Sequence, residues 1–249
     1  MPTYNDYGIV LNSHDLGESD KILNIYTKEN GLVRAVAKGV RKTSSKFSGK
    51  TDQLSCCYFH FASGKNLDTV CDCEQVNSFS LLRSNLFCLT NAVLFLEIVS
   101  NFAYEDESDS HLIYDLLYES LNRLQTSSNP ELDSINFISR FLSLHGYKPQ
   151  LETCVSCSED VGADLLSAQE SKKYPYSSIL GGILCNNCSS VVNSKPVDLE
   201  VLKILLESES SSFQVSQNKN IRSAVELLRE HLDIRAKNKI KSFDLVFSL

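Results

Sequence analysis

The chain has 249 residues, and at roughly 100 to 200 residues per domain this length suits one large domain or two to three small ones. Hydrophobic residues make up 42% of the sequence and charged residues 22%, which excludes a disordered or fibrous protein. The formal net charge is −7, but a polyanion responds to local clusters of positive charge, so the average does not exclude a nucleic-acid partner.

No targeting signal is evident. The stretch 1–6 lacks the basic and then apolar segments of a secretory signal, and the longest apolar stretch, 92–99, falls short of the roughly 20 residues that span a bilayer. We therefore expect a cytoplasmic protein with no membrane partner. Five of the nine cysteines lie in apolar segments and are expected to be reduced, buried, small hydrophobic residues: Cys56, Cys57, Cys71, Cys73 and Cys88.

Short strands with turn residues between them are predicted before residue 78, at 7–12, 21–27, 32–37, 54–61 and 67–76. Asn30-Gly31 lies between two apolar, β-branched runs and predicts a type I′ hairpin that pairs the second and third strands antiparallel. Five short strands cannot cover both faces of a flat sheet, whereas closure into a small barrel of the OB type removes the exposed edges.

After Phe79 the apolar residues recur with a helical period, which predicts helices at 81–104, 111–124, 130–145, 198–209 and 220–232. The first is apolar on most sides and suits the middle of a bundle. Asn129-Pro130 supplies an N-cap and a first-turn proline for the third, and Gly146 ends it. A serine-rich linker, 208–212, joins the last two helices.

Two CxxC pairs, Cys154/Cys157 and Cys185/Cys188, are separated by a segment that is too poor in large apolar residues to build a core. Such pairs are typical of a tetrahedral four-thiolate zinc site, and a closed thiolate shell stabilises a fold and leaves no position for catalysis. Disulfides, a redox CxxC or a site without metal are the alternatives.

Six cations and no acidic residue lie between Gly31 and Lys50, in a run rich in Gly, Ser and Thr that suits a flexible loop close to a phosphate backbone. A solvated face is the alternative interpretation. On an OB barrel, which binds single strands with a positive groove and stacking aromatics, these residues are predicted to bind DNA: Arg34, Lys38, Arg41, Lys42, Lys46 and Lys50.

Four rings on the neighbouring strands, Tyr26, Tyr58, Phe59 and Phe61, could stack on bases, but strand alternation must turn half of them into the core. A second basic group at 222–241 is interleaved with acidic residues up to Asp233, which suits a salt-bridged helix face. The tail 235–241 is more purely basic.

No enzyme signature is present: the sequence has no phosphate loop, nucleophile elbow or HExxH motif, and its five histidines lack ligand spacing. An enzyme of nucleic-acid metabolism that depends on zinc or thiols is therefore disfavoured. A protein-binding adaptor, with structural zinc and a barrel that holds a peptide, remains the alternative to a DNA-binding protein.

An ordered set of motifs resembles the RecO family of bacterial DNA repair proteins over nearly the whole chain. The set comprises 8–11, 17–22, 27–31, 37–42 with 45–47, 141–149, Gly181-Gly182 and the two CxxC pairs. Two departures are an insertion around 170–178 and Ser158 in place of a glycine that often follows the second cysteine. Some relatives lack the cysteines, so zinc is not indispensable to the family.

The resemblance implies an α+β multidomain protein with an N-terminal OB-type β-barrel (1–79), a helical bundle domain (80–150 and 193–249) and a zinc-ribbon-like four-cysteine module (151–192). It also implies a cytoplasmic, nucleoid-associated, non-enzymatic mediator of DNA repair and homologous recombination. Such a mediator binds single- and double-stranded DNA, anneals complementary strands, and works with RecR and the C-terminal tail of single-stranded DNA-binding protein to load recombinase.

Overall fold

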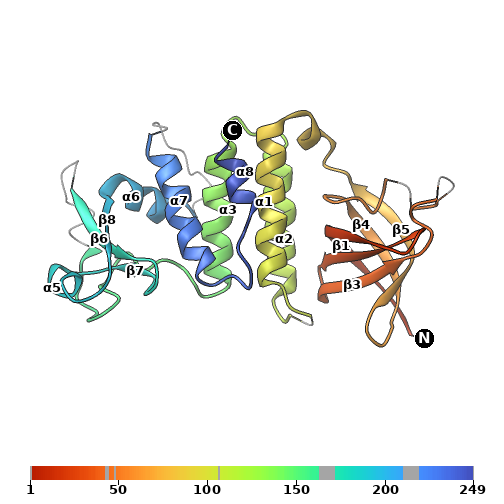
Figure 1. Cartoon of the computed structure of the whole chain (residues 1–249), viewed down its shortest axis with the longest axis horizontal. Coiled ribbons are helices and arrows are strands. Elements are labelled where there is room, and N and C mark those ends of the chain that lie inside the picture. Colours follow the sequence, from red (N-terminus) through yellow and green to blue (C-terminus); the bar gives the residue numbers. More distant parts are fainter. Residues whose placement is uncertain are drawn as a thin grey trace. The chain divides into compact units, whose positions relative to one another are not determined.

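The computed structural model describes residues 2–42, 45–47, 49–105, 107–162, 172–209 and 219–248. Two compact units make up the chain (Figure 1): Met1–Ser128 with Ile240–Leu249, and Asn129–Lys239. The second unit is therefore inserted, in sequence, between two parts of the first. The domain boundaries predicted after residues 79, 150 and 192 stay predictions, and parts of the predicted insertion and serine linker lie outside the described residues.

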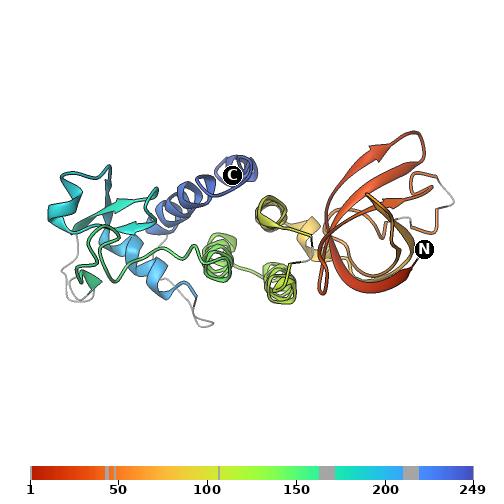
Figure 2. The same cartoon turned by 90° about the horizontal axis from the view of Figure 1, so that it is seen from below.

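Five strands of the first unit form a closed barrel in the order β1-β2-β3-β5-β4, which is the OB arrangement (Figure 2). Four of its strand pairs are antiparallel, and β3 pairs with β5 in parallel at only two positions. The strands agree with the predicted set and are β1 (Thr3–Leu16), β2 (Asp20–Thr27), β3 (Gly31–Ala37), β4 (Cys56–Ala62) and β5 (Asp68–Asn77).

Alternating residues of each strand fill the barrel interior, including Leu23, Ile25, Phe59 and Phe61, all of which are fully buried. The predicted burial of cysteines holds for Cys56, Cys57, Cys73 and Cys88 and in part for Cys71. The interior cluster also includes Phe47, which comes from the connection between β3 and β4 and not from a strand.

The turn between β2 and β3 differs from the predicted type I′ turn. Thr27 pairs with Gly31, so three residues form the turn, and positive φ occurs at Gly31 but not at Asn30. The physical reason is Asp6, a buried carboxylate on β1 that accepts hydrogen bonds from the Glu29 amide and the Asn30 side chain. The predicted antiparallel pairing of the two strands is confirmed.

Among its described residues the first unit also contains a 3₁₀ helix and three α-helices: η1 (Ser80–Ser84), α1 (Leu86–Phe102), α2 (Ser110–Leu124) and α8 (Ser242–Val246). Asn85 caps α1, whose side chains are buried along most of its length although Leu86 and Phe87 are exposed. The sequence did not indicate α8. Its start is held by Glu97 of α1, which accepts hydrogen bonds from the amides of Lys241 and Ser242.

The second unit packs α3 against α7 and α6 against α7. It also contains a three-stranded sheet in the order β7-β6-β8. Asn129 caps α3 and Gly146 follows it with positive φ, as predicted. The elements are α3 (Pro130–Leu144), β6 (Lys173–Ser177), β7 (Gly182–Ile183), α5 (Asn186–Ser189), β8 (Lys195–Asp198), α6 (Leu199–Glu207) and α7 (Lys219–Asp233).

A buried histidine ties this sheet to α7. The carbonyl of Tyr147 can only accept, so His231 Nε2 donates to it at 2.7 Å, and His231 Nδ1 accepts from the Tyr176 hydroxyl at 3.0 Å. Arg235 donates to the Ser178 carbonyl and lies over the Tyr147 ring. Burial, with the charge of Arg235, lowers the pKa of His231 from 6.5 to about 4, so the ring is neutral at pH 7.

We predict that the second unit loses stability as the pH falls. The unfolded chain protonates His231 near pH 6.5 and the folded chain only near pH 4. The contribution of His231 is therefore complete above pH 6.5 and declines below it, by roughly 3 kcal/mol in total. Denaturant unfolding followed by circular dichroism should show this decline in the wild type and a flatter profile in His231→Gln. Both proteins keep the four cysteines, so parallel profiles would contradict the prediction.

Candidate metal centre and nucleic-acid interface

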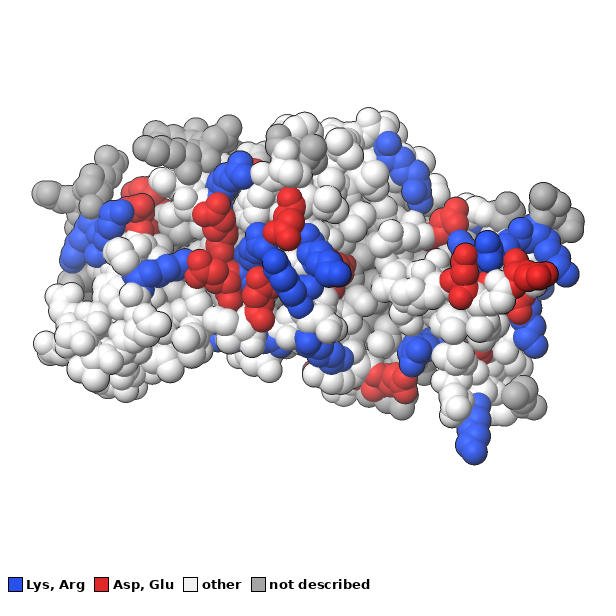
Figure 3. Space-filling view, in the orientation of Figure 1, with Lys and Arg blue, Asp and Glu red and all other residues white. Residues whose placement is uncertain are grey.

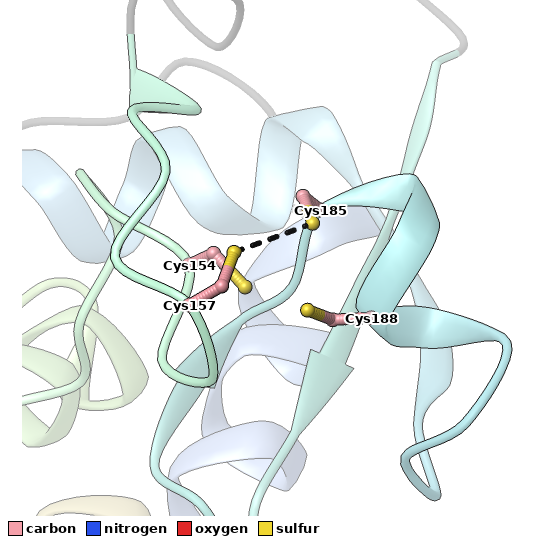
Figure 4. Close-up of side chains that lie close together, drawn as sticks. All are labelled: Cys154, Cys157, Cys185 and Cys188. Atoms are coloured by element: carbon pink, nitrogen blue, oxygen red, sulfur yellow. Dashed lines mark hydrogen bonds between the residues drawn. The ribbon is translucent and has the colours of Figure 1, made fainter.

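The two CxxC pairs come together in the second unit (Figure 4). The Sγ atoms of Cys154, Cys157, Cys185 and Cys188 all lie within 4.8 Å of one another. Four thiolates at about 2.3 Å from a tetrahedral ion are about 3.8 Å apart, and the Cys157 and Cys185 sulfurs are separated by 3.7 Å. The donor set and its spacing therefore fit a metal ion, as the sequence predicted.

Each pair lies in a tight turn. The Ser158 amide donates to the Cys154 carbonyl, and Ser158 adopts φ 64°, a left-handed conformation that explains why glycine suits this position. The Ser189 amide donates to the Cys185 carbonyl across α5. Burial opposes ionisation of Cys154, but hydrogen bonds from nearby backbone amides outweigh it and lower the pKa of this thiol to about 6. Cys154 therefore favours the thiolate form that a metal needs, whereas the pKa of each of the other three thiols is raised.

A small apolar cluster surrounds the four sulfurs. Cys154, Leu184 and Cys185 are buried in it, and Val155, Val161 and Val192 pack against them. The cluster is too small to hold the segment alone, which is the situation in which a metal supplies stability.

The predicted DNA-binding residues all belong to β3 or to the connection that follows it, and we call residues 38–50 the basic loop. Arg34 is exposed on β3, opposite Asn24. Lys38, Arg41, Lys42 and Lys46 are exposed, and Lys50 is half-buried. These cations thus lie on β3 and on the connection that follows it. Figure 3 shows Lys and Arg side chains interspersed with Asp and Glu on the face of the barrel that it draws.

The described residues of the basic loop, 38–42, 45–47 and 49–50, are held by contacts with the barrel, whereas the composition of the loop suggested flexibility. Its first turn is held by Asp20, which accepts from the Gly39 amide at 2.8 Å. The Phe47 ring is 3% exposed inside the barrel, because this apolar side chain would otherwise face water. Beyond the loop, Leu54 donates to the Val10 carbonyl.

Three of the predicted cations already contact the protein. Arg41 forms an ion pair with Asp15 at 3.2 Å, and Lys46 donates to the Cys71 carbonyl at 2.6 Å with Asp72 at 3.5 Å. Lys50 donates to the Cys73 carbonyl. Both surface ion pairs are exposed and contribute little to stability, so a phosphate can replace either carboxylate.

The four rings considered as stacking groups divide as strand alternation requires. Phe59 and Phe61 are in the barrel core, and Tyr26 is buried with its hydroxyl bonded to Glu107. Tyr58 is 37% exposed and packs against Tyr7, which the sequence analysis did not single out. In the basic tail, 235–241, Arg235 contacts the Tyr147 ring and donates to the Ser178 carbonyl.

A five-stranded barrel of the OB type with a cationic connection after its third strand, in one chain with four cysteines that could hold a metal ion, defines a class of OB-fold proteins with a four-cysteine module. The family models that match the chain are "Recombination protein O N terminal" over residues 1–79 and "Recombination protein O C terminal" over residues 83–243. The chain belongs to the RecO family of DNA repair and recombination proteins.

Curated relatives agree with this assignment. The chain is 32% identical to the DNA repair protein RecO of Pelotomaculum thermopropionicum over 98% of its own length and 93% of the relative. It is 32% identical to the RecO protein of Dehalococcoides mccartyi strain BAV1 over 88% of the chain and 85% of the relative. For the RecO protein of Cutibacterium acnes the identity is 33%, over 76% of the chain and 75% of the relative. Within the described residues, no helix has the length and apolar character needed to cross a membrane.

We predict that the purified protein holds about one equivalent of metal and that Cys154→Ser or Cys185→Ser loosens residues 151–192. A structural ion of this kind contributes of order 10 kcal/mol to a module without a sufficient core. Elemental analysis gives the metal content, and hydrogen exchange with mass spectrometry should show faster exchange in the module while the barrel stays protected. Cys88→Ser, at a buried cysteine of the other unit, is the control. Less than a tenth of an equivalent in fresh protein would contradict the prediction.

Proposed function

We propose that this chain is a mediator of DNA repair and homologous recombination that binds single- and double-stranded DNA and anneals complementary strands without catalysing a reaction. The observation that carries the proposal is the set of cations on β3 and the basic loop, on a barrel of the OB type. OB barrels bind single strands through such positive surfaces. The names of the RecO relatives, which are DNA repair proteins, support it.

Its partners follow from the family resemblance. RecR and the C-terminal tail of single-stranded DNA-binding protein would bring the mediator to gaps, where it helps to load recombinase. The proposed place of action is the cytoplasm of a bacterium, at the nucleoid.

The proposed metal is zinc, in a structural role. Zinc prefers four ligands in a tetrahedron, accepts four thiolates and has no redox chemistry of its own. With all four positions taken by Cys154, Cys157, Cys185 and Cys188, the ion would hold the two turns together and leave no site for water or substrate.

Annealing follows from the physics of two like-charged strands that must approach before they pair. Cations lower this repulsion. A protein that binds the phosphates and leaves the bases free allows the bases of complementary strands to pair while both strands are bound. Tyr7 and Tyr58, on neighbouring strands of the barrel, form an exposed ring pair that suits weak contact with bases. No nucleotide hydrolysis is needed.

We predict that changing Lys38, Arg41, Lys42 and Lys46 to Ala weakens DNA binding about equally on all sequences. Each lost phosphate contact should also flatten the slope of log affinity against log salt by roughly 0.7 for single strands. Fluorescence anisotropy with labelled oligonucleotides at several salt concentrations measures both quantities.

The matched control removes four positive charges from the second unit, at Lys148, Lys173, Lys195 and Lys203, each of which forms a surface ion pair. It changes the net charge equally and should leave the slope nearly unchanged. If the loop variant keeps both the affinity and the slope of the wild type, the basic loop is only a solvated face and the adaptor hypothesis becomes the better one.

We predict ATP-independent acceleration of annealing that decreases steeply with rising salt, because salt screens the interactions that bring the strands together. Stopped-flow fluorescence with complementary labelled oligonucleotides measures the rate. The loop variant should lose the acceleration and the matched control should keep it. Annealing at the protein-free rate at low salt, with wild-type protein in excess, would remove the mechanism proposed here.

A further inference from the structure

The barrel has an incomplete seam between β3 and β5. These strands pair only at Ala35 with Asp68 and at Val36 with Thr69, whereas β3 pairs with β2 along its whole length. Before Ala35, the edge of β3 that faces away from β2 meets the segment after α1, where the Leu32 amide donates to the Tyr104 carbonyl. The strands therefore part at Arg34.

A largely polar hollow of about 340 Å³ lies at this seam, lined by Arg34 of β3, the β4–β5 loop with Lys65 and Asn66, and Asp68 and Glu105. Its volume exceeds that of a single water, ~30 Å³, by an order of magnitude. All of these residues belong to the first unit. Lys65 could not be predicted from the sequence, because an isolated lysine in a loop forms no pattern.

The two cations at the hollow are available to a ligand. Arg34 and Lys65 are exposed, and neither forms an ion pair with any carboxylate in the part of the chain that the structure describes. The same is true of Lys38 and Lys42, which follow Arg34 along the chain. The available cations thus run from the hollow along β3 to the start of the basic loop, a path of about 13 Å between Arg34 and Lys38.

The loop that carries Lys65 is held in a fixed shape. A Cβ atom at Gly64 would lie 1.9 Å from the Leu67 carbonyl oxygen, so only glycine fits the turn. The Gly64 amide donates to Asp68 Oδ1 at 2.8 Å, and the Tyr4 hydroxyl donates to Asp68 Oδ2 at 2.5 Å. Both oxygens of Asp68 are thus engaged by the protein, and Lys65 is presented at the rim without having to order a loop.

We propose that this hollow is a phosphate subsite, in which Arg34 and Lys65 bind one phosphodiester of a single DNA strand that continues along β3 to Lys38 and Lys42. The subsite rests on the proposed DNA-binding function and extends it to the β4–β5 loop. The bound group is an oxyanion, which both a DNA backbone and free phosphate could supply. Two carboxylates in the lining, Asp68 and Glu105, repel such an anion, and Glu105 is exposed.

Two substitutions at the hollow should therefore change the affinity for DNA in opposite directions. Lys65→Ala should weaken binding of a labelled oligo(dT) roughly threefold at moderate salt and flatten the salt slope by roughly 0.7. Glu105→Gln should strengthen binding, because it removes a repulsive charge and keeps the backbone that meets Gly31. The matched controls are Lys203→Ala and Glu200→Gln, an ion pair on α6, and neither should change affinity or slope.

Competition separates the two sources of phosphate. Inorganic phosphate or a mononucleotide at millimolar concentration should displace the oligonucleotide no better than an equal ionic strength of chloride. Stronger displacement would overturn the DNA assignment in favour of a free phosphate.

Wild-type binding by Lys65→Ala, or no gain with Glu105→Gln, would overturn the subsite. If the basic-loop variant still loses affinity in that case, the proposed DNA-binding function stands. If neither variant loses affinity, both proposals fail.

Discussion

Burial of Phe47 inside the barrel is the interaction on which the proposed DNA surface depends. A small barrel is filled by its own side chains, and the Phe47 ring, at 3% exposure, joins that filling from a connection and not from a strand. Burying such a ring contributes about 1.5–3 kcal/mol. Lys46 and Lys50 flank the ring in sequence, so its burial also sets where they meet the carbonyls of β5. Apolar packing thereby places positive charge on a barrel whose chain is acidic overall.

The charge balance of the loop follows from this placement. Asp20 sits at its start with a pKa lowered chiefly by the Gly39 amide, then by Ser19, and further by the nearby charges of Lys38 and Lys42. The carboxylate therefore remains ionised and holds the turn, while the ammonium groups of both lysines point to solvent without an ion pair among the described residues. Arg41 and Lys46 have exposed carboxylate partners, and such pairs exchange for a phosphate at little cost. The net charge of −7 thus coexists with a local surface suited to a polyanion.

Sequence reasoning succeeded where the information is local and failed where it depends on distant contacts. Alternating strands, the cap at Asn129 and the stop at Gly146 were predicted, and the CxxC spacings carried enough chemistry to predict that four sulfurs would meet. The predicted type of the β2–β3 turn was wrong because Asp6, from another strand, stabilises a longer turn. Helix α8 was missed because five residues show no period, and the Glu97 side chain that holds it lies 145 residues earlier than Ser242. The role proposed for Lys65 could not be predicted, because only the closed barrel brings it to the same hollow as Arg34.

A single DNA strand is proposed to follow the cations of β3 and of the loops beside it. Brief acetylation of lysines with and without a single-stranded oligonucleotide, read out by mass spectrometry, tests this directly in the whole protein. Lys38, Lys42 and Lys65 should become protected, whereas Lys173 and Lys203 of the other unit should not. Protection confined to residues 129–239, or no protection at saturating DNA, would contradict this proposal.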